Sequence, residues 1–115
     1  MDTLPKFAGR TKLVALFGSP VGFDVLPDQL ETVVKGFADA GIAGYNVTMP
    51  CKTKVLPYLD ELSPVAELMG AVNTVVVKDG KSIGDNTDGA GFVRNMRLHG
   101  FEPEGKIVTV AGAGG

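Results

Sequence analysis

The sequence Asn-Val-Thr-Met-Pro-Cys-Lys, ending at Lys52, places a lysine where a short strand gives way to a helix. We predict a strand over residues 43–49 and a helix over residues 52–62 that Pro50 begins. Lys52 then lies in the first turn, where a cation opposes the helix macrodipole at a cost of about 0.3–1 kcal/mol. The same field disfavours the charged form and lowers the pKa of a lysine, which suits a residue that exchanges a proton near neutral pH. The alternative is a solvated surface lysine.

Three further polar residues fall near the ends of predicted strands. Asp88 follows a strand and precedes a helix, so it either caps that helix or pairs with Lys52, which keeps the acid ionised and orients the lysine. Thr48 either places its hydroxyl on a ligand or caps the helix that follows it. Asn73 lies in a valine-rich strand, where asparagine is disfavoured, and either ends the pairing there or reaches a polar ligand. The candidate site therefore has Lys52 and Asp88 for proton transfer, with Thr48 and Asn73 as ligand contacts.

A glycine-rich turn closes the sequence after a predicted buried strand over residues 106–110. Glycines after such a strand let the backbone approach a pyrophosphate, and the next helix offers its N-terminus to the phosphates. Because the sequence contains only the front half of this pattern, without the helix, it is a weak signal for a dinucleotide. The candidate cofactor-binding residues are Gly112, Ala113, Gly114 and Gly115.

Two other reactive side chains have simpler explanations. Cys51 is the only cysteine, and no histidine lies near it in the sequence to act as its base, which favours a plain small side chain. His99 precedes Gly100 at a predicted helix end, where a cation interacts favourably with the last carbonyl groups. No metal site is predicted.

The elements that must position these residues alternate between strands and helices. Asp79-Gly80 is typical of a two-residue hairpin turn, and the apolar residues of segment 27–40 recur at helical spacing. The alternation predicts an α/β fold with a mostly parallel open sheet and helices on both faces, so that ligands bind beyond the carboxyl ends of the strands. The predicted strands are 12–17, 23–25, 43–49, 71–77, 81–85 and 106–110, and the predicted helices are 27–40, 52–62, 64–69 and 89–99.

Composition excludes several classes of protein. The 115 residues carry a net charge of -2 and are 44% apolar, which fits one soluble domain with a core of its own. The sequence has no apolar run of about 18 residues and no cluster of lysine and arginine, so neither a membrane nor a nucleic acid is an expected partner. We expect a cytoplasmic protein that binds a small molecule.

Six short stretches of the chain, in this order, carry a resemblance to a known family. They are Gly18-Ser19-Pro20, the segment from Asn46 to Lys52, Asp60-Glu61-Leu62, Gly70-Ala71-Val72-Asn73-Thr74, Asn86-Thr87-Asp88-Gly89 and Gly112-Ala113-Gly114-Gly115. Together they make the chain similar to the shikimate dehydrogenase family, which includes the shikimate/quinate dehydrogenases.

The resemblance implies an oxidoreductase of chorismate and aromatic amino acid biosynthesis. Its reaction would be the reversible NADP-dependent reduction of 3-dehydroshikimate to shikimate. Lys52 and Asp88 would correspond to the catalytic pair, the lysine handling the hydroxyl proton while hydride passes between the nicotinamide and the ring carbon. Thr48 and Asn73 would contact substrate hydroxyls, and the glycines would begin the NADP-binding domain. Quinate in place of shikimate, and NAD in place of NADP, stay open.

The chain departs from the family pattern in two places. Members carry, after Gly-Ser-Pro, a Ser-x-Ser-Pro segment that holds the substrate carboxylate and then a helix, whereas here Val21-Gly22 leads almost directly to Phe23. The resemblance divides the chain into a substrate-binding domain, residues 1–105, incomplete after Pro20, and residues 106–115, the first strand and glycine turn of a truncated Rossmann domain. We expect this chain alone to be inactive, and a non-catalytic shikimate- or quinate-binding fragment is the alternative. The missing helix would leave a sheet face exposed, and a homodimer is one way to cover it.

Overall fold

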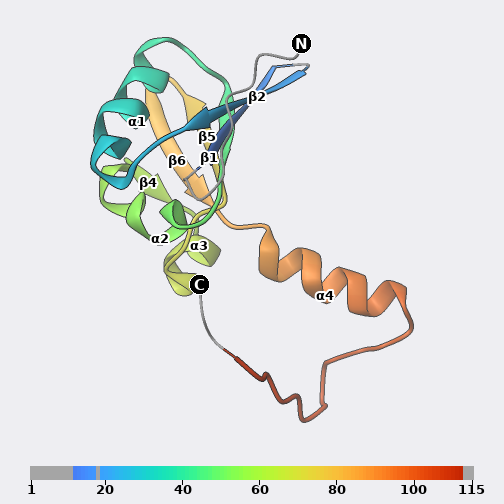
Figure 1. The fold of residues 1–115 in the computed structure, drawn as a ribbon. Helices are drawn as coiled ribbons and strands as arrows, with labels where there is room; N and C mark the ends of the chain where they lie inside the picture. Colours follow the sequence, from blue (N-terminus) through green and yellow to red (C-terminus); the bar gives the residue numbers. More distant parts are fainter. Residues whose placement is uncertain (1–11, 18, 113–115) are drawn as a thin grey trace.

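The computed structural model describes residues 12–17 and 19–112, and these build one six-stranded sheet with helices beside it (Figure 1). The strand order is β2-β1-β3-β5-β6-β4. The strands are β1 (Lys12–Phe17), β2 (Ser19–Asp24), β3 (Gly44–Val47), β4 (Glu61–Leu62), β5 (Thr74–Lys78) and β6 (Lys81–Asp85). The helices are α1 (Leu30–Asp39), α2 (Cys51–Lys54), α3 (Pro64–Met69) and α4 (Asp88–Leu98), with 3-10 turns η1 (Pro27–Gln29) and η2 (Leu56–Tyr58).

The α/β class is confirmed, but the prediction of a mostly parallel sheet is wrong. Among the described strands, β4 and β6 form the one parallel pair, and the other four pairings are antiparallel. The hairpin at Asp79-Gly80 has both residues at positive φ (52° and 75°), a geometry that joins β5 to β6 as antiparallel neighbours. The sequence interpretation treated each strand–helix–strand unit as a parallel crossover, whereas β5 returns antiparallel beside β3.

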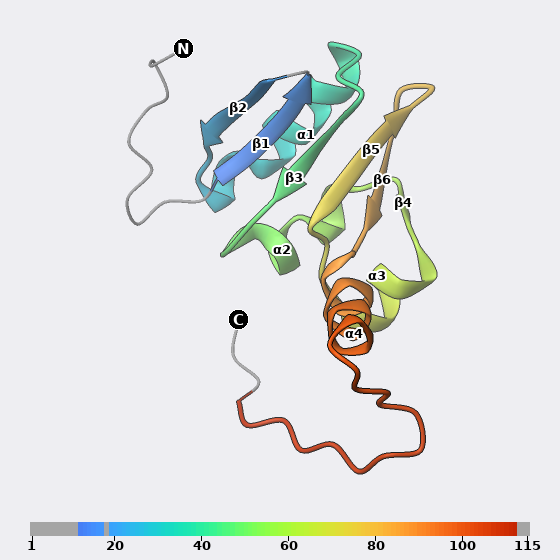
Figure 2. The same ribbon diagram turned by 90° about the vertical axis from the view of Figure 1, so that its right-hand side faces the viewer.

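Of the described helices, α1 lies against one face of the sheet, and α4 extends beyond the ends of the strands (Figure 1 and Figure 2). Figure 2 shows α1 behind the strands, and the face turned to the viewer has no described helix on it. The core lies between α1 and the sheet, where Leu30 and Val34 pack with Tyr45, Val47 and other buried residues. The prediction of helices on both faces is therefore wrong for the described residues, and Val76, on the uncovered face, is 48% exposed.

The predicted helix over residues 52–62 breaks after one turn. α2 ends at Lys54, η2 follows over residues 56–58, and β4 begins at Glu61. Pro57 explains the break, because proline has no N–H to donate to the carbonyl four residues earlier and its ring crowds that turn. A single turn has a small dipole, and its C-terminal end lies well before Asp60 and Glu61, the acidic residues at the end of the predicted helix. The dipole argument for Lys52 therefore rested on a helix that does not form.

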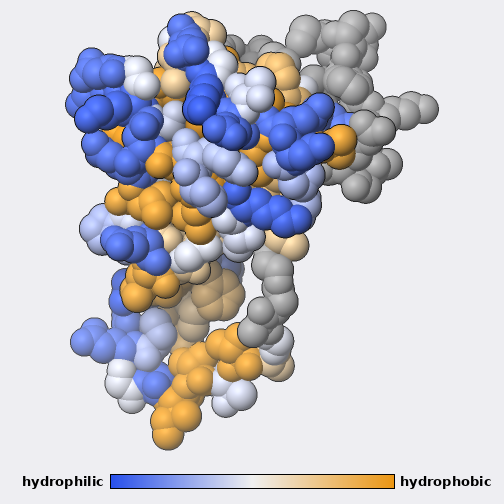
Figure 3. All heavy atoms as spheres, turned by 90° about the vertical axis from the view of Figure 1, so that its left-hand side faces the viewer, coloured by the Kyte–Doolittle hydropathy of each residue, from blue (hydrophilic) through white to orange (hydrophobic). Residues whose placement is uncertain are grey.

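The predicted strand over residues 106–110 also does not form. The segment is irregular, and Ile107, Val108 and Val110 are 100%, 52% and 79% exposed. Within the described part of the chain no strand lies beside it, so its backbone has no ladder to join. Figure 3 shows hydrophobic spheres at the surface of the lower part of the molecule, where α4 and this segment lie.

Candidate active site

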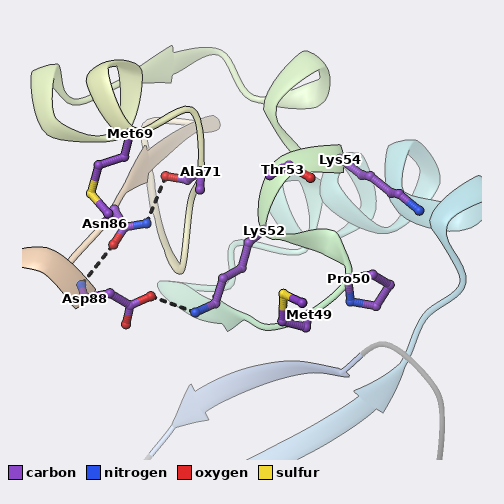
Figure 4. Close-up of a pocket in the computed structure, with 9 residues that line it drawn as sticks. All are labelled: Met49, Pro50, Lys52, Thr53, Lys54, Met69, Ala71, Asn86 and Asp88. Atoms are coloured by element: carbon purple, nitrogen blue, oxygen red, sulfur yellow. Dashed lines mark hydrogen bonds and ion pairs between the residues drawn. The ribbon is translucent and has the colours of Figure 1, made fainter. Parts of the chain in front are cut away.

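A pocket of about 410 Å³ opens where the strands give way to α2, α3 and α4 (Figure 4). It combines an apolar wall of methionine, proline and alanine side chains with one lysine–aspartate pair. The nine lining residues are Met49, Pro50, Lys52, Thr53, Lys54, Met69, Ala71, Asn86 and Asp88. The volume falls within the range of small-molecule sites.

Lys52 and Asp88 form an ion pair in this pocket. Lys52 Nζ lies 2.7 Å from Asp88 Oδ2, and the two side chains are 25% and 51% exposed. The hydrogen bond from Lys52 lowers the pKa of Asp88, burial partly opposes this shift, and the charge of Lys52 and a bond from Asn73 lower it further. Asp88 is therefore ionised at neutral pH and holds the ammonium group of Lys52 in a fixed direction.

The side chain of Asp88 does not cap α4. The residue before the helix is Thr87, which gives no side-chain cap, and the Asp88 N–H donates to Asn86 Oδ1 at 2.9 Å. Of the two alternatives that the sequence left open, the structure therefore places the carboxylate of Asp88 in the pair with Lys52.

Asn73 lies immediately before β5, not within a strand as predicted. Its Nδ2 donates to Asp88 Oδ1 at 3.0 Å and to Thr87 Oγ1 at 2.9 Å. Its Oδ1 accepts from the Thr87 N–H at 3.0 Å and from Thr74 Oγ1 at 2.9 Å. All four hydrogen-bonding positions of the amide are thus used, and they fix the start of α4 beside the pocket.

Thr48, like Asn73, is not among the residues that line the pocket. Its carbonyl oxygen accepts from the Cys51 N–H at 2.9 Å, and the start of α2, at Pro50, has no side-chain cap in the described chain. The capping alternative for Thr48 is therefore not observed. Its part as a substrate contact stays a prediction.

Asn86 is a site residue whose role the sequence analysis missed. It is 4% exposed, and its Nδ2 donates to the Ala71 carbonyl oxygen at 3.0 Å. Its Oδ1 accepts from the N–H two residues later, a turn that asparagine commonly makes. The signal was present in Asn-x-Asp directly before a helix, which could have been interpreted as such a turn.

The remaining candidates lie apart from the pocket. Gly112 has φ +104°, and nothing lies within 4 Å of where its Cβ would be, while residues 113–115 lie outside the described residues. Cys51 is a buried free thiol, and His99 ends α4 with Nδ1 2.8 Å from the Asn95 carbonyl oxygen. Over residues 12–17 and 19–112, no group of histidine, cysteine and acidic residues suits a metal ion, and no helix is long and apolar enough to span a membrane.

Comparison with known proteins identifies the family. Residues 11–75 match the model of the shikimate dehydrogenase substrate binding domain. The chain belongs to the shikimate dehydrogenase family.

One curated relative is a shikimate dehydrogenase (NADP(+)) from Alkaliphilus metalliredigens, 41% identical over 133 residues, which cover 96% of this chain and 46% of the relative. Since 133 aligned positions exceed the 115 residues of this chain, the relative has residues in that span with no counterpart here. The chain spans about half the length of this relative.

Two solved structures show the fold at substantial sequence identity. Shikimate 5-dehydrogenase from Listeria monocytogenes, in complex with shikimate and NAD, is 49% identical with a TM-score of 0.77, over 81% of this chain and 32% of that protein. The 5-ketofructose reductase of a Gluconobacter strain is 41% identical with a TM-score of 0.62, over 66% of this chain and 27% of that protein.

Proposed function

We propose that this chain is the substrate-binding part of a shikimate dehydrogenase and that its pocket binds shikimate and 3-dehydroshikimate. The Lys52–Asp88 ion pair inside the pocket is the observation that carries the proposal. The apolar wall, with Met49 and Met69, suits one face of a carbocyclic ring, and the ion pair suits a ring hydroxyl. Thr48 and Asn73 are the further substrate contacts of this proposal, and Asn73 would exchange one of its bonds to Thr87 or Thr74 for a bond to the substrate.

The chemistry proposed for the pair is proton transfer at that hydroxyl. When a ring ketone is reduced, its oxygen gains negative charge, and the ammonium group of Lys52 gives it a proton. In the reverse direction Lys52 accepts the hydroxyl proton, and the ionised Asp88 stabilises the charged lysine that results. The hydride would come from a bound nicotinamide cofactor, NADP as in the name of the Alkaliphilus relative or NAD as in the Listeria complex.

The described residues do not form a cofactor site. Residues 106–110 have no strand beside them, and no atom closes around the Cβ position of Gly112. We therefore expect no turnover from this chain alone. This same observation favours the second candidate, a module that binds shikimate or quinate without binding a cofactor.

We also propose a domain division, a cellular location and an oligomeric state for the chain. Residues 1–105 would be the substrate-binding domain, followed by the start of a cofactor domain, in a cytoplasmic protein. A homodimer would cover the sheet face that carries Val76. Sedimentation of the purified chain tests the dimer.

A titration of the ¹⁵N-labelled chain with shikimate, followed by NMR, tests the function. We expect saturable shifts at Lys52, Asn73 and Asp88 and their loss in Lys52→Met. Lys35→Met is the matched control, because Lys35 pairs with Glu31 on the exposed face of α1, and it should leave binding unchanged. A dispersed spectrum that does not respond to millimolar shikimate would refute the proposal. A change in NADPH fluorescence when the chain is added would refute the second candidate, a module that binds no cofactor.

A further inference from the structure

Asn86 joins three parts of the site through partly buried hydrogen bonds. Its side chain is held by the Ala71 carbonyl oxygen, in the segment that leads into β5, and it holds the N–H of Asp88. Its own N–H donates to Asp85 Oδ1 at 2.8 Å, and the Ser63 hydroxyl donates to the same oxygen at 2.6 Å. At 4% exposure, Asn86 makes these bonds with little competition from water.

We infer that Asn86 is a positioning residue for the Lys52–Asp88 pair, acting through the backbone of Asp88. This inference rests on the function proposed for the pocket. Asp88 is held at two ends, by Asn86 at its N–H and by Asn73 at Oδ1, so that Oδ2 is left to face Lys52. The Val72 N–H, next to Ala71, donates to the Lys52 carbonyl oxygen at 2.8 Å. The same stretch of backbone, residues 71–72, therefore contacts Lys52 directly and Asp88 through Asn86.

The plain alternative is that Asn86 only caps α4 and fills the core. A cap contributes stability wherever its helix lies, but it has no effect on how a carboxylate two residues later titrates or how tightly the pocket binds its ligand. Those two quantities therefore separate a positioning role from a structural one.

The test uses Asn86→Ala in the full chain, with the Asp88 carboxyl followed by ¹³C NMR over a pH series and shikimate affinity by titration. We expect the pKa of Asp88 to rise towards its ordinary value. We also expect the Kd for shikimate to rise about tenfold or more, because a displaced Asp88 no longer holds Lys52 in the position that contacts the substrate. Asn86→Ser keeps an oxygen that accepts from the same N–H, and it should restore much of both. Asn95→Ala, at an exposed position on α4, is the control and should change neither.

A folded Asn86→Ala chain whose Asp88 titration and shikimate affinity match those of the native chain would overturn the inference. If the native chain binds no shikimate, the proposed function fails, while the Asp88 titration still decides the role of Asn86. If Asn86→Ala does not fold, the serine variant decides. A native-like Asp88 titration in it supports positioning, and loss of its fold or an ordinary titration overturns it.

Discussion

A double-mutant cycle on the ion pair measures how firmly the structure holds it. Lys52→Met keeps the length of the side chain and removes the charge, and Asp88→Asn removes the negative charge with little change in shape. Exposed ion pairs contribute about 0.2–1 kcal/mol, and this pair should lie near the top of that range. Lys52 is only a quarter exposed, and Asn73 fixes the second carboxylate oxygen. We expect a coupling free energy of about 1 kcal/mol at pH 7.

The pH dependence has a definite sign. Because the pKa of Asp88 is lowered in the folded chain, the pair contributes its full stability above the unfolded-state pKa, near 4, and loses it as the pH falls through the folded-state value. Urea unfolding of the four chains of the cycle, followed by circular dichroism, measures the coupling free energy at pH 7 and at pH 2. We expect the coupling to be weaker at pH 2 than at pH 7.

The pair of Lys35 and Glu31 is the reference for this cycle. Its side chains are 68% and 56% exposed on α1, and such pairs contribute about 0.3–0.5 kcal/mol. A coupling for Lys52 and Asp88 no larger than this reference, or one as large at pH 2 as at pH 7, would refute this account of the pair. An unfavourable helix dipole at Lys52 would make Lys52→Met neutral or slightly stabilising, whereas the ion pair makes it destabilising, so the sign of the effect is itself a test.

Two further predictions concern buried groups. Gly84→Ala should destabilise the chain by about 1–3 kcal/mol, because its Cβ would lie 2.6 Å from Leu59 Cδ1 and 2.7 Å from Val72 Cγ2. Gly36→Ala, in open space on α1, should instead stabilise it by about 0.5–1 kcal/mol. Urea unfolding compares the two variants, and equal effects would contradict this packing. Burial raises the pKa of Tyr45 to about 12, so the free energy of unfolding should fall by about 2–3 kcal/mol between pH 10 and pH 12, because Tyr45 ionises first in the unfolded state. Tyr45→Phe should lack this decline. A native-like decline in Tyr45→Phe would show that other groups cause it.

The local elements could be predicted well from the sequence because their signals are local. The strand 12–17, the helix 64–69 and the hairpin at Asp79-Gly80 match β1, α3 and the β5–β6 turn. The helix over residues 27–40 differs only in that its first turn, residues 27–29, is a 3-10 turn. Each of these depends on apolar spacing or on turn residues that act within a few positions.

What could not be predicted depends on contacts between distant segments. Strand direction was one such property, since β3 and β5 are antiparallel across a connection that contains α2, η2, β4 and α3, and such a connection leaves either direction open to sequence reasoning. The segment 106–110 is apolar enough for a strand, but a strand needs a neighbour to pair with. The break at Pro57 was a local signal that the interpretation overlooked.

The candidate site combines both kinds of information. Lys52 and Asp88 were selected for their chemistry, and the structure brings them to 2.7 Å although 36 positions separate them. The register of the β5–β6 hairpin explains how this is done. Thr74 pairs with Asp85, and the Asn73 N–H donates to the Asp85 carbonyl oxygen at 3.1 Å, so the residues just outside the hairpin meet at its open end.

The open end of the hairpin is where the ion pair is positioned. The turn at residues 79–80 sets the register at one end of the hairpin, and Asn73 and Asn86 convert that register into the position of Asp88 at the other. Lys52 is tied to the same place by the bond from the Val72 N–H. These contacts lie within residues 52–88, and the bond from the Val47 N–H to the Asn73 carbonyl oxygen at 2.8 Å joins them to β3, so the pair is positioned by the hairpin together with the neighbouring strand.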